Sequence, residues 1–185
     1  GNYWRYNELG FFKKKKLTSK KPLPYGKITD TLLKEYSVGI LTVIIKKKLI
    51  KNKKTIFDTN FDMLSDMDFI LKFSKDHKFG CVQEPVAIYR QHENQLQNKN
   101  INLQADQICE WYEKIKLSKE FGSSEKLLMI RNKCNFLKIV KYINQKLYFK
   151  SLKGIIFYPE IIGKIKLFLM LITSKKIFNK LINLS

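Results

Sequence analysis

The chain has 185 residues, 44% of them hydrophobic and 13% aromatic, so it is long enough to bury a core and too apolar for a disordered protein. Its 36 Lys and Arg residues against 16 Asp and Glu give a formal net charge of +20, which is unusual for a soluble enzyme. Most of the excess is Lys, which binds phosphate or an anionic surface as a point charge. Nucleic acid, anionic lipid and phosphate-bearing substrates all stay open as partners. Because the chain is also rich in Ile, Asn and Phe, as an AT-rich genome produces, we give the charge little weight as evidence for function.

The three cysteines, Cys81, Cys109 and Cys134, are odd in number and form no Cys-x-x-Cys pair. This pattern predicts neither a disulfide framework nor a zinc site, and it favours a reducing compartment. No secretory signal pattern is present. The sequence begins at Gly1 without Met, inside a strand-like segment, so we expect it to be a fragment.

The N-terminal part predicts short strands and turns. Residues 2–6 are aromatic and strand-like, and residues 11–16 are expected to form the return strand of a hairpin. Residues 19–26 contain two Pro and a Gly, which predict a loop. A short helix follows, with Thr29 or Asp30 as its N-cap.

The middle part alternates apolar runs with polar segments. Val38 to Ile45 is a continuous apolar run, which predicts a fully buried strand, although a helix that starts after Ser37 also fits the pattern. Residues 65–77 predict an amphipathic helix with Ser65 as its N-cap. Residues 81–89 predict two short strands or one extended run that bends at Pro85, and residues 91–100 a polar loop.

Helices are expected from Leu103 onward. A regular apolar stripe supports this expectation; it consists of Phe136, Ile139, Val140, Ile143 and Leu147. Residues 161–173 are nearly all apolar but carry Lys164 and Lys166, and the run is shorter than the roughly 20 residues of a membrane span. Two interpretations remain open: a helix in a membrane interface, or a helix that packs on the domain core.

Three carboxylates lie close together at Asp62, Asp66 and Asp68. Helix capping and the helix dipole are sufficient to explain acids in the first turn of a helix. The alternative is that one of them acts as a general base, because a helix start holds a carboxylate in place at the edge of a sheet.

The order of the motifs favours the second explanation. Phe57-Asp58 precedes Ser65-Asp66-Met67-Asp68, and Glu84-Pro85-Val86-Ala87-Ile88-Tyr89-Arg90-Gln91-His92 follows. Over residues 1–100 this series resembles the second half of family 2 glycosyltransferases. The resemblance implies an α/β fold, namely the acceptor-side half of a Rossmann-like GT-A domain in residues 1–100. A helical extension in residues 101–150 and an apolar, Lys-rich helix in residues 151–185 would follow it.

The resemblance also implies roles for individual residues. Asp66 stands where the family has the catalytic base of an inverting transfer, and Ser65 stands where many members have Glu. His92 stands where related enzymes place a His near the metal and diphosphate, and Arg90 is a candidate for binding the diphosphate. Asp68 is expected to support the helix start or pair with a neighbouring basic group. These assignments make Ser65, Asp68 and Arg90 candidate substrate-binding residues and His92 a candidate metal ligand.

The family's Asp-x-Asp metal motif has no match upstream of Asp58. We therefore expect the main ligands of a Mn²⁺ or Mg²⁺ ion to lie in a missing N-terminal half, and the fragment alone to be inactive. The implied partners are a nucleotide-sugar donor and a glycan or lipid-linked acceptor at the cytoplasmic face of a membrane. The alternatives are a basic nucleic-acid-binding protein, which the lack of any DNA or RNA motif disfavours, and a membrane-surface scaffold with a degenerate site.

Overall fold

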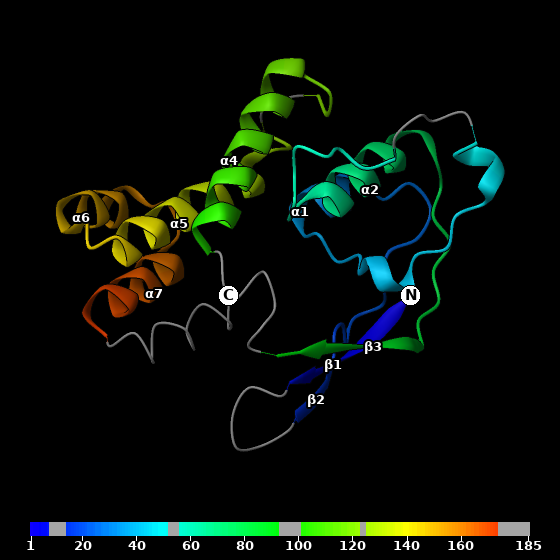
Figure 1. Ribbon diagram of the computed structural model, residues 1–185, viewed down its shortest axis with the longest axis horizontal. Helices are drawn as coiled ribbons and strands as arrows, with labels where there is room; N and C mark the ends of the chain where they lie inside the picture. Colours follow the sequence, from blue (N-terminus) through cyan, green and yellow to red (C-terminus); the bar gives the residue numbers. More distant parts are fainter. Residues whose placement is uncertain (8–13, 52–55, 93–100, 123–124, 174–185) are drawn as a thin grey trace. The chain divides into compact units, whose positions relative to one another are not determined.

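The computed structural model describes residues 1–7, 14–51, 56–92, 101–122 and 125–173 (Figure 1). The chain is a mixed α/β protein: a small sheet of three strands comes first, and a mainly helical region follows. It divides into two compact units, Gly1–Lys99 and Asn100–Ser185. The first unit contains the strands and the three candidate acids, so the candidate site belongs to it.

The sheet of the first unit consists of β1 (Asn2–Asn7), β2 (Lys14–Leu17) and β3 (Pro85–Gln91), in the order β2-β1-β3. The first two strands pair antiparallel, which confirms the predicted hairpin pairing; its turn, in residues 8–13, lies outside the described residues. The third strand pairs parallel with β1. Parallel neighbours need a long crossover connection, and the helices of this unit lie in that crossover.

The crossover contains two α-helices and two short 3₁₀ helices: α1 (Thr29–Lys34), η1 (Ile40–Thr42), η2 (Lys47–Leu49) and α2 (Ser65–Asp76). Both α-helices bury apolar side chains. Ser74 and Thr29 join them through a hydrogen bond of 3.0 Å between their hydroxyl oxygens. The buried hydrophobic side chains of this unit, among the described residues, are Ile28, Leu32, Leu33, Phe61, Leu64, Met67, Phe69, Ile70, Leu71 and Phe73.

The predicted buried strand at Val38 to Ile45 is wrong. This segment forms the turn of η1, and Ile44 is 98% exposed. The Thr42 hydroxyl oxygen lies 2.9 Å from the carbonyl oxygens of both Gly1 and Gly39, so the segment binds the start of β1 through a side chain. A strand needs a neighbour for its backbone hydrogen bonds, and an apolar run does not show whether one is available.

The predicted helix caps are also wrong, although both helices lie where the sequence places them. The N-cap position of α2 is Leu64 and that of α1 is Ile28, and neither makes a side-chain cap hydrogen bond. Both residues are buried. Burying a large aliphatic side chain stabilises a fold by about 1.5–3 kcal/mol, whereas a cap contributes about 1 kcal/mol, so packing sets the helix starts here.

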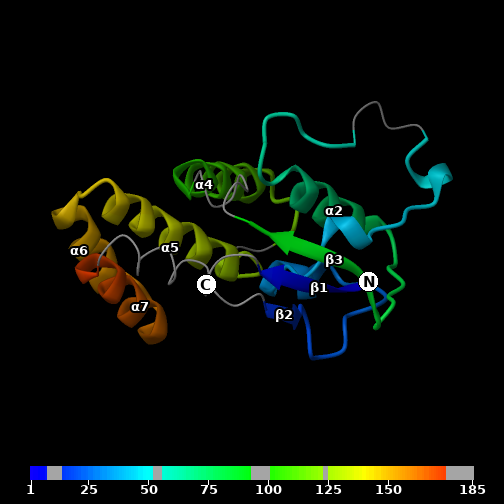
Figure 2. The same ribbon diagram turned by 60° about the horizontal axis from the view of Figure 1, so that its bottom comes forward.

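The second unit consists of α4 (Ile101–Ser118), α5 (Leu128–Asn144), α6 (Tyr148–Phe157) and α7 (Ile161–Ile172) (Figure 2). Gly122, with a φ of 85°, lies in the connection between α4 and α5. The last three helices share a core that consists of Ile139, Val140, Ile143, Ile155, Tyr158, Leu167 and Met170. Leu147 does not extend the α5 stripe, because the helix ends at Asn144 and the chain turns at Lys146, whose φ is 58°.

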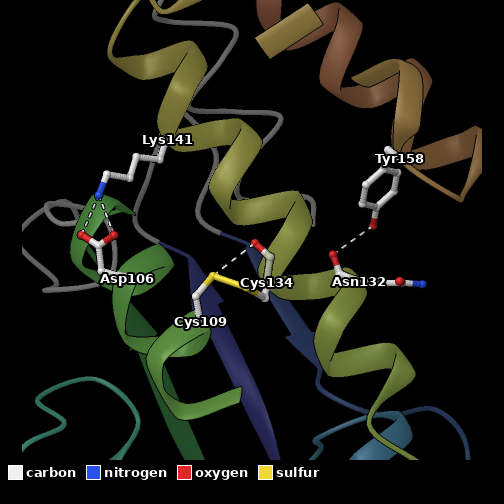
Figure 3. The surroundings of a disulfide bond; sticks show 6 residues. All are labelled: Asp106, Cys109, Asn132, Cys134, Lys141 and Tyr158. Carbon is white, nitrogen blue, oxygen red and sulfur yellow. Dashed lines mark hydrogen bonds and ion pairs between the residues drawn. A yellow bond between two sulfur atoms is a disulfide. The ribbon is translucent and has the colours of Figure 1, made fainter. Parts of the chain in front are cut away.

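A disulfide bond joins Cys109 of α4 to Cys134 of α5, and the prediction that the cysteines form none is wrong (Figure 3). The Cα atoms lie 5.1 Å apart, within the range for a disulfide. Asp106 and Lys141 form an ion pair between the same two helices, with Nζ 2.7 Å from Oδ2. The cysteines are 25 residues apart, a spacing that fits no short motif, so only the packing of α4 on α5 brings them together. The sequence argument for a reducing compartment fails with it.

Candidate functional site

Asp66 lies in the first turn of α2 and is half-buried. Its Oδ1 atom accepts a hydrogen bond of 2.7 Å from the backbone N–H of Met67. Within the described residues the Asp66 carboxylate forms no ion pair. Ser65 precedes it on the same helix turn and is also half-buried. A carboxylate that is held by its own backbone, but not neutralised by a basic side chain, keeps the capacity to accept a proton.

Asp68 lies in a different environment two residues later. Asp68 is only 3% exposed, and both of its carboxylate oxygens lie 2.8 Å from Nζ of Lys72, one helical turn further on. A buried carboxylate with a lysine partner one turn away supports the helix. Asp68 therefore supports the helix through its ion pair with Lys72. Asp66, at the same helix start, has no basic partner among the described residues.

Tyr36 lies near Asp66, and sequence reasoning gave it no functional role. Burial raises the pKa of Tyr36 well above its usual value, and the charges of Asp66 and Tyr3 raise it further. The Tyr36 hydroxyl is buried and has no hydrogen-bond partner in the described part of the chain. An unsatisfied buried hydroxyl costs about 1–3 kcal/mol, so the described residues leave the hydrogen-bonding capacity of Tyr36 unused at a cost to stability.

Tyr3 connects this neighbourhood to the sheet. Its ring packs edge-on against Tyr89 of β3, with the ring centroids 6.2 Å apart. It also lies against Gly39, where an added Cβ would be 2.5 Å from the Tyr3 ring. Three segments thus contribute to this neighbourhood: the start of α2, the segment after α1, and the face of β1 and β3 that carries Tyr3 and Tyr89. No short sequence motif joins these three segments.

Arg90 and His92 lie at the C-terminal end of β3. Side chains alternate along a strand, so Arg90 leaves β3 on the face opposite to Tyr89, whose ring meets Tyr3. His92 directly follows the end of β3 and is half-buried. Among the described residues, no group of three His, Cys, Asp or Glu side chains could hold a metal ion. The role of His92 as a metal ligand therefore stays a prediction of the resemblance, which places the main ligands outside this chain.

The chain matches no protein-family model, no curated protein and no solved structure. In the part of the chain that the structure describes, no helix is both long and apolar enough to cross a membrane. A proposal for the function of this chain therefore depends on its residues and their geometry.

Replacing Tyr36 with phenylalanine is expected to leave the free energy of unfolding unchanged or to raise it by about 1 kcal/mol, because the change removes a buried hydroxyl without a partner. Urea unfolding of the wild-type and variant proteins measures the difference. Tyr25→Phe is the matched control, since Tyr25 is 78% exposed and its hydroxyl is already hydrated. A loss of more than 1 kcal/mol for the Tyr36 variant alone would show that its hydroxyl has a protein partner.

Proposed function

We propose that this chain supplies the acceptor side of an inverting glycosyltransferase of the family 2 type, with Asp66 as the general base. The observation that supports the proposal is a half-buried Asp66 carboxylate without an ion pair in the described residues, whose charge acts on the Tyr36 hydroxyl, which is buried and has no hydrogen-bond partner there. One group can accept a proton and the other can donate a hydrogen bond to the same incoming oxygen.

The proposed reaction is a single displacement. The Asp66 carboxylate takes the proton of an acceptor hydroxyl, and that oxygen attacks the anomeric carbon of the donor sugar. The bond between this carbon and the diphosphate oxygen breaks, and the nucleoside diphosphate leaves with the electron pair. Tyr36 positions the acceptor oxygen by a hydrogen bond, and the neighbouring Ser65 offers a second hydroxyl to the acceptor. The resemblance gives Arg90 a role in binding diphosphate, although the structure places it on the other face of the sheet.

Family resemblance also implies a Mn²⁺ or Mg²⁺ ion that neutralises the leaving diphosphate. Because the described residues include no group of three potential ligands, no step is assigned to a metal here. The single Asp-x-Asp sequence of the chain is Asp66-Met67-Asp68, and its second carboxylate pairs with Lys72. The proposal therefore places the donor and its metal on residues outside these 185, and the acceptor is a glycan or a lipid-linked glycan at the cytoplasmic face of a membrane.

The proposal is tested with radiolabelled UDP-glucose, UDP-galactose and UDP-N-acetylglucosamine and a membrane fraction of the native cells as the source of acceptor. The 185-residue chain alone is expected to transfer no sugar. A longer polypeptide in which an Asp-x-Asp-bearing half precedes it is expected to transfer one of the three. Transfer by the 185 residues alone would contradict the placement of the donor site, and no transfer of any of the three by the longer polypeptide would contradict the assigned reaction.

A further inference from the structure

The outer face of α7 is an exposed apolar stripe. Its six members, at spacings that fall on one side of a helix, are each between 41% and 82% exposed: Ile161, Ile162, Ile165, Phe168, Leu169 and Ile172. The opposite side of α7 carries Leu167 and Met170, which are buried in the core shared with α5 and α6. The helix therefore packs on the domain, as one sequence interpretation held, and still presents a second apolar face that this core does not cover.

Two lysines border this stripe. At about 100° per residue, Lys164 and Lys166 lie roughly a quarter turn to either side of its centre, on the two boundaries with the buried face. Both are half-buried, and burial lowers the pKa of Lys166. Lysines in this position lay their carbon chains along an apolar surface and extend the ammonium group to the level of lipid headgroups.

The preceding helix continues the same chemistry. On α6, Phe149 is 81% exposed and Ile156 is 64% exposed, and Lys150 and Lys153 lie among the exposed residues of the same helix. From Tyr148 to Ile172 the sequence has four lysines and a single acid, Glu160. The Glu160 side chain accepts a hydrogen bond of 3.0 Å from Asn132, and within the described residues none of the four lysines forms an ion pair.

A pocket of about 390 Å³ lies between α5 and α6 beside these residues. Three lysines line it, Lys138 from α5 and Lys150 and Lys153 from α6, together with Tyr142, Phe157 and Tyr158. Phe157 is 77% exposed, so the pocket reaches the apolar surface of α6. Three lysine side chains next to one exposed aromatic ring, that of Phe157, suit a phosphate group that is attached to an apolar molecule.

We propose that α6 and α7 bind the surface of an anionic phospholipid bilayer, with the apolar stripe in the interface and the three-lysine pocket on a lipid phosphate. The charge of the surface supports this choice of partner: from Tyr148 to Ile172 four lysines outnumber the single acid, Glu160, which accepts a hydrogen bond from Asn132. The helices lie in the plane of the interface, because 12 residues are too few for a span. This proposal involves no sugar transfer, so it stands or falls separately from the proposed reaction.

Flotation of the full chain with lipid vesicles tests the proposal. Vesicles of phosphatidylcholine mixed with phosphatidylglycerol are expected to carry the protein upward. Vesicles of phosphatidylcholine alone are expected to carry at least about tenfold less protein. This difference in bound protein is expected to shrink at high salt. Equal flotation with both vesicles, or with neither, overturns the proposal. Competition with inorganic phosphate is a further test. If millimolar phosphate abolishes flotation with the anionic vesicles and sodium chloride of equal ionic strength does not, the pocket binds free phosphate in place of the membrane. That result also overturns the proposal.

Variants assign the binding to this surface. Ile162→Glu together with Ile165→Glu is expected to lower flotation with anionic vesicles at least about tenfold, since a charge in the interface opposes insertion. Leu117→Glu, at a residue of α4 that is 79% exposed, is the control and is expected to bind like the wild type. Lys150→Glu together with Lys153→Glu is expected to lower flotation with anionic vesicles at least about tenfold. Lys20→Glu together with Lys21→Glu changes the net charge equally and is expected to lower flotation little.

Circular dichroism verifies that each variant keeps its helices, and size-exclusion chromatography with light scattering reports self-association. Loss of binding by folded α6 and α7 variants, with both controls unaffected, supports the proposal. Equal losses in the controls would show that net charge alone causes binding. A dimer that the Ile162 and Ile165 substitutions dissociate, with no flotation of the wild type, would show that a second copy of the chain covers the stripe.

Discussion

Asp66→Asn is expected to lower kcat by about 10²- to 10⁴-fold in a polypeptide that also carries the donor-binding half, because an amide cannot take the proton of the acceptor hydroxyl. The substitution keeps the size of the side chain and an oxygen that can accept the hydrogen bond from the Met67 backbone, so the helix start should be retained. The Km for the nucleotide sugar is expected to change little, because the base acts on the acceptor. Initial rates over a range of donor concentrations measure both quantities.

Two neighbouring acids provide the controls for this substitution. Asp62 is exposed and lies four residues before Asp66, and Asp62→Asn should leave kcat within about twofold of the wild type. Asp68→Asn removes the charge that pairs with Lys72 and should lower stability before it lowers kcat per folded molecule. Equal loss of kcat and of donor affinity in Asp66→Asn would show that Asp66 is structural. Full activity of that variant would show that another group is the base.

Reduction of the disulfide bond between Cys109 and Cys134 is expected to lower the free energy of unfolding of the helical unit by about 3 kcal/mol. The estimate follows from the loop of 25 residues that the bond closes, since cross-linking removes conformations from the unfolded chain. Reduction also leaves a thiol at Cys109, whose sulfur lies 3.6 Å from the carbonyl oxygen of Cys134 and can then donate a weak hydrogen bond (Figure 3). The ion pair between Asp106 and Lys141 continues to join the two helices.

Urea unfolding with and without dithiothreitol measures this effect. Trp111 of α4 is fully buried and reports on the helical unit, and a Trp4→Phe background removes the signal of the other unit's tryptophan. Cys81→Ser should respond to dithiothreitol like the wild type, because Cys81 is a free cysteine. The double variant Cys109→Ser, Cys134→Ser should no longer respond. An unchanged unfolding midpoint of the wild type in dithiothreitol would show that the bond contributes no stability.

The sequence predicted the elements whose signals are local. The apolar face of residues 65–77 led to α2, and the apolar stripe that begins at Phe136 led to α5, since helical periodicity is visible within a dozen residues. The strand-like segments at the N-terminus led to the pairing of β1 with β2. The candidate base was also accessible to sequence reasoning, because Asp66 lies in a run of acids at a helix start followed by a recognisable order of motifs.

Local signals failed where a distant partner decides the structure. The apolar run around Ile44 has the composition of a buried strand, yet no strand among the described residues pairs with it and Ile44 is exposed. Ser65 has good capping chemistry, yet the burial of Leu64 sets the helix start.

By itself the sequence determined the N-terminal strand pairing, the places of α1, α2 and α5, and a short list of chemically capable residues, because periodicity and side-chain chemistry are properties of neighbouring positions. Only the tertiary structure decided which of those residues meet. It placed Tyr36 within electrostatic range of Asp66, joined Cys109 to Cys134 across 25 residues, and put Arg90 on the face of β3 opposite to Tyr89. It also separated the two sides of α7 into a packed face and an exposed one. The physical reason is that burial and hydrogen bonding depend on distances in space, which separation along the chain does not specify.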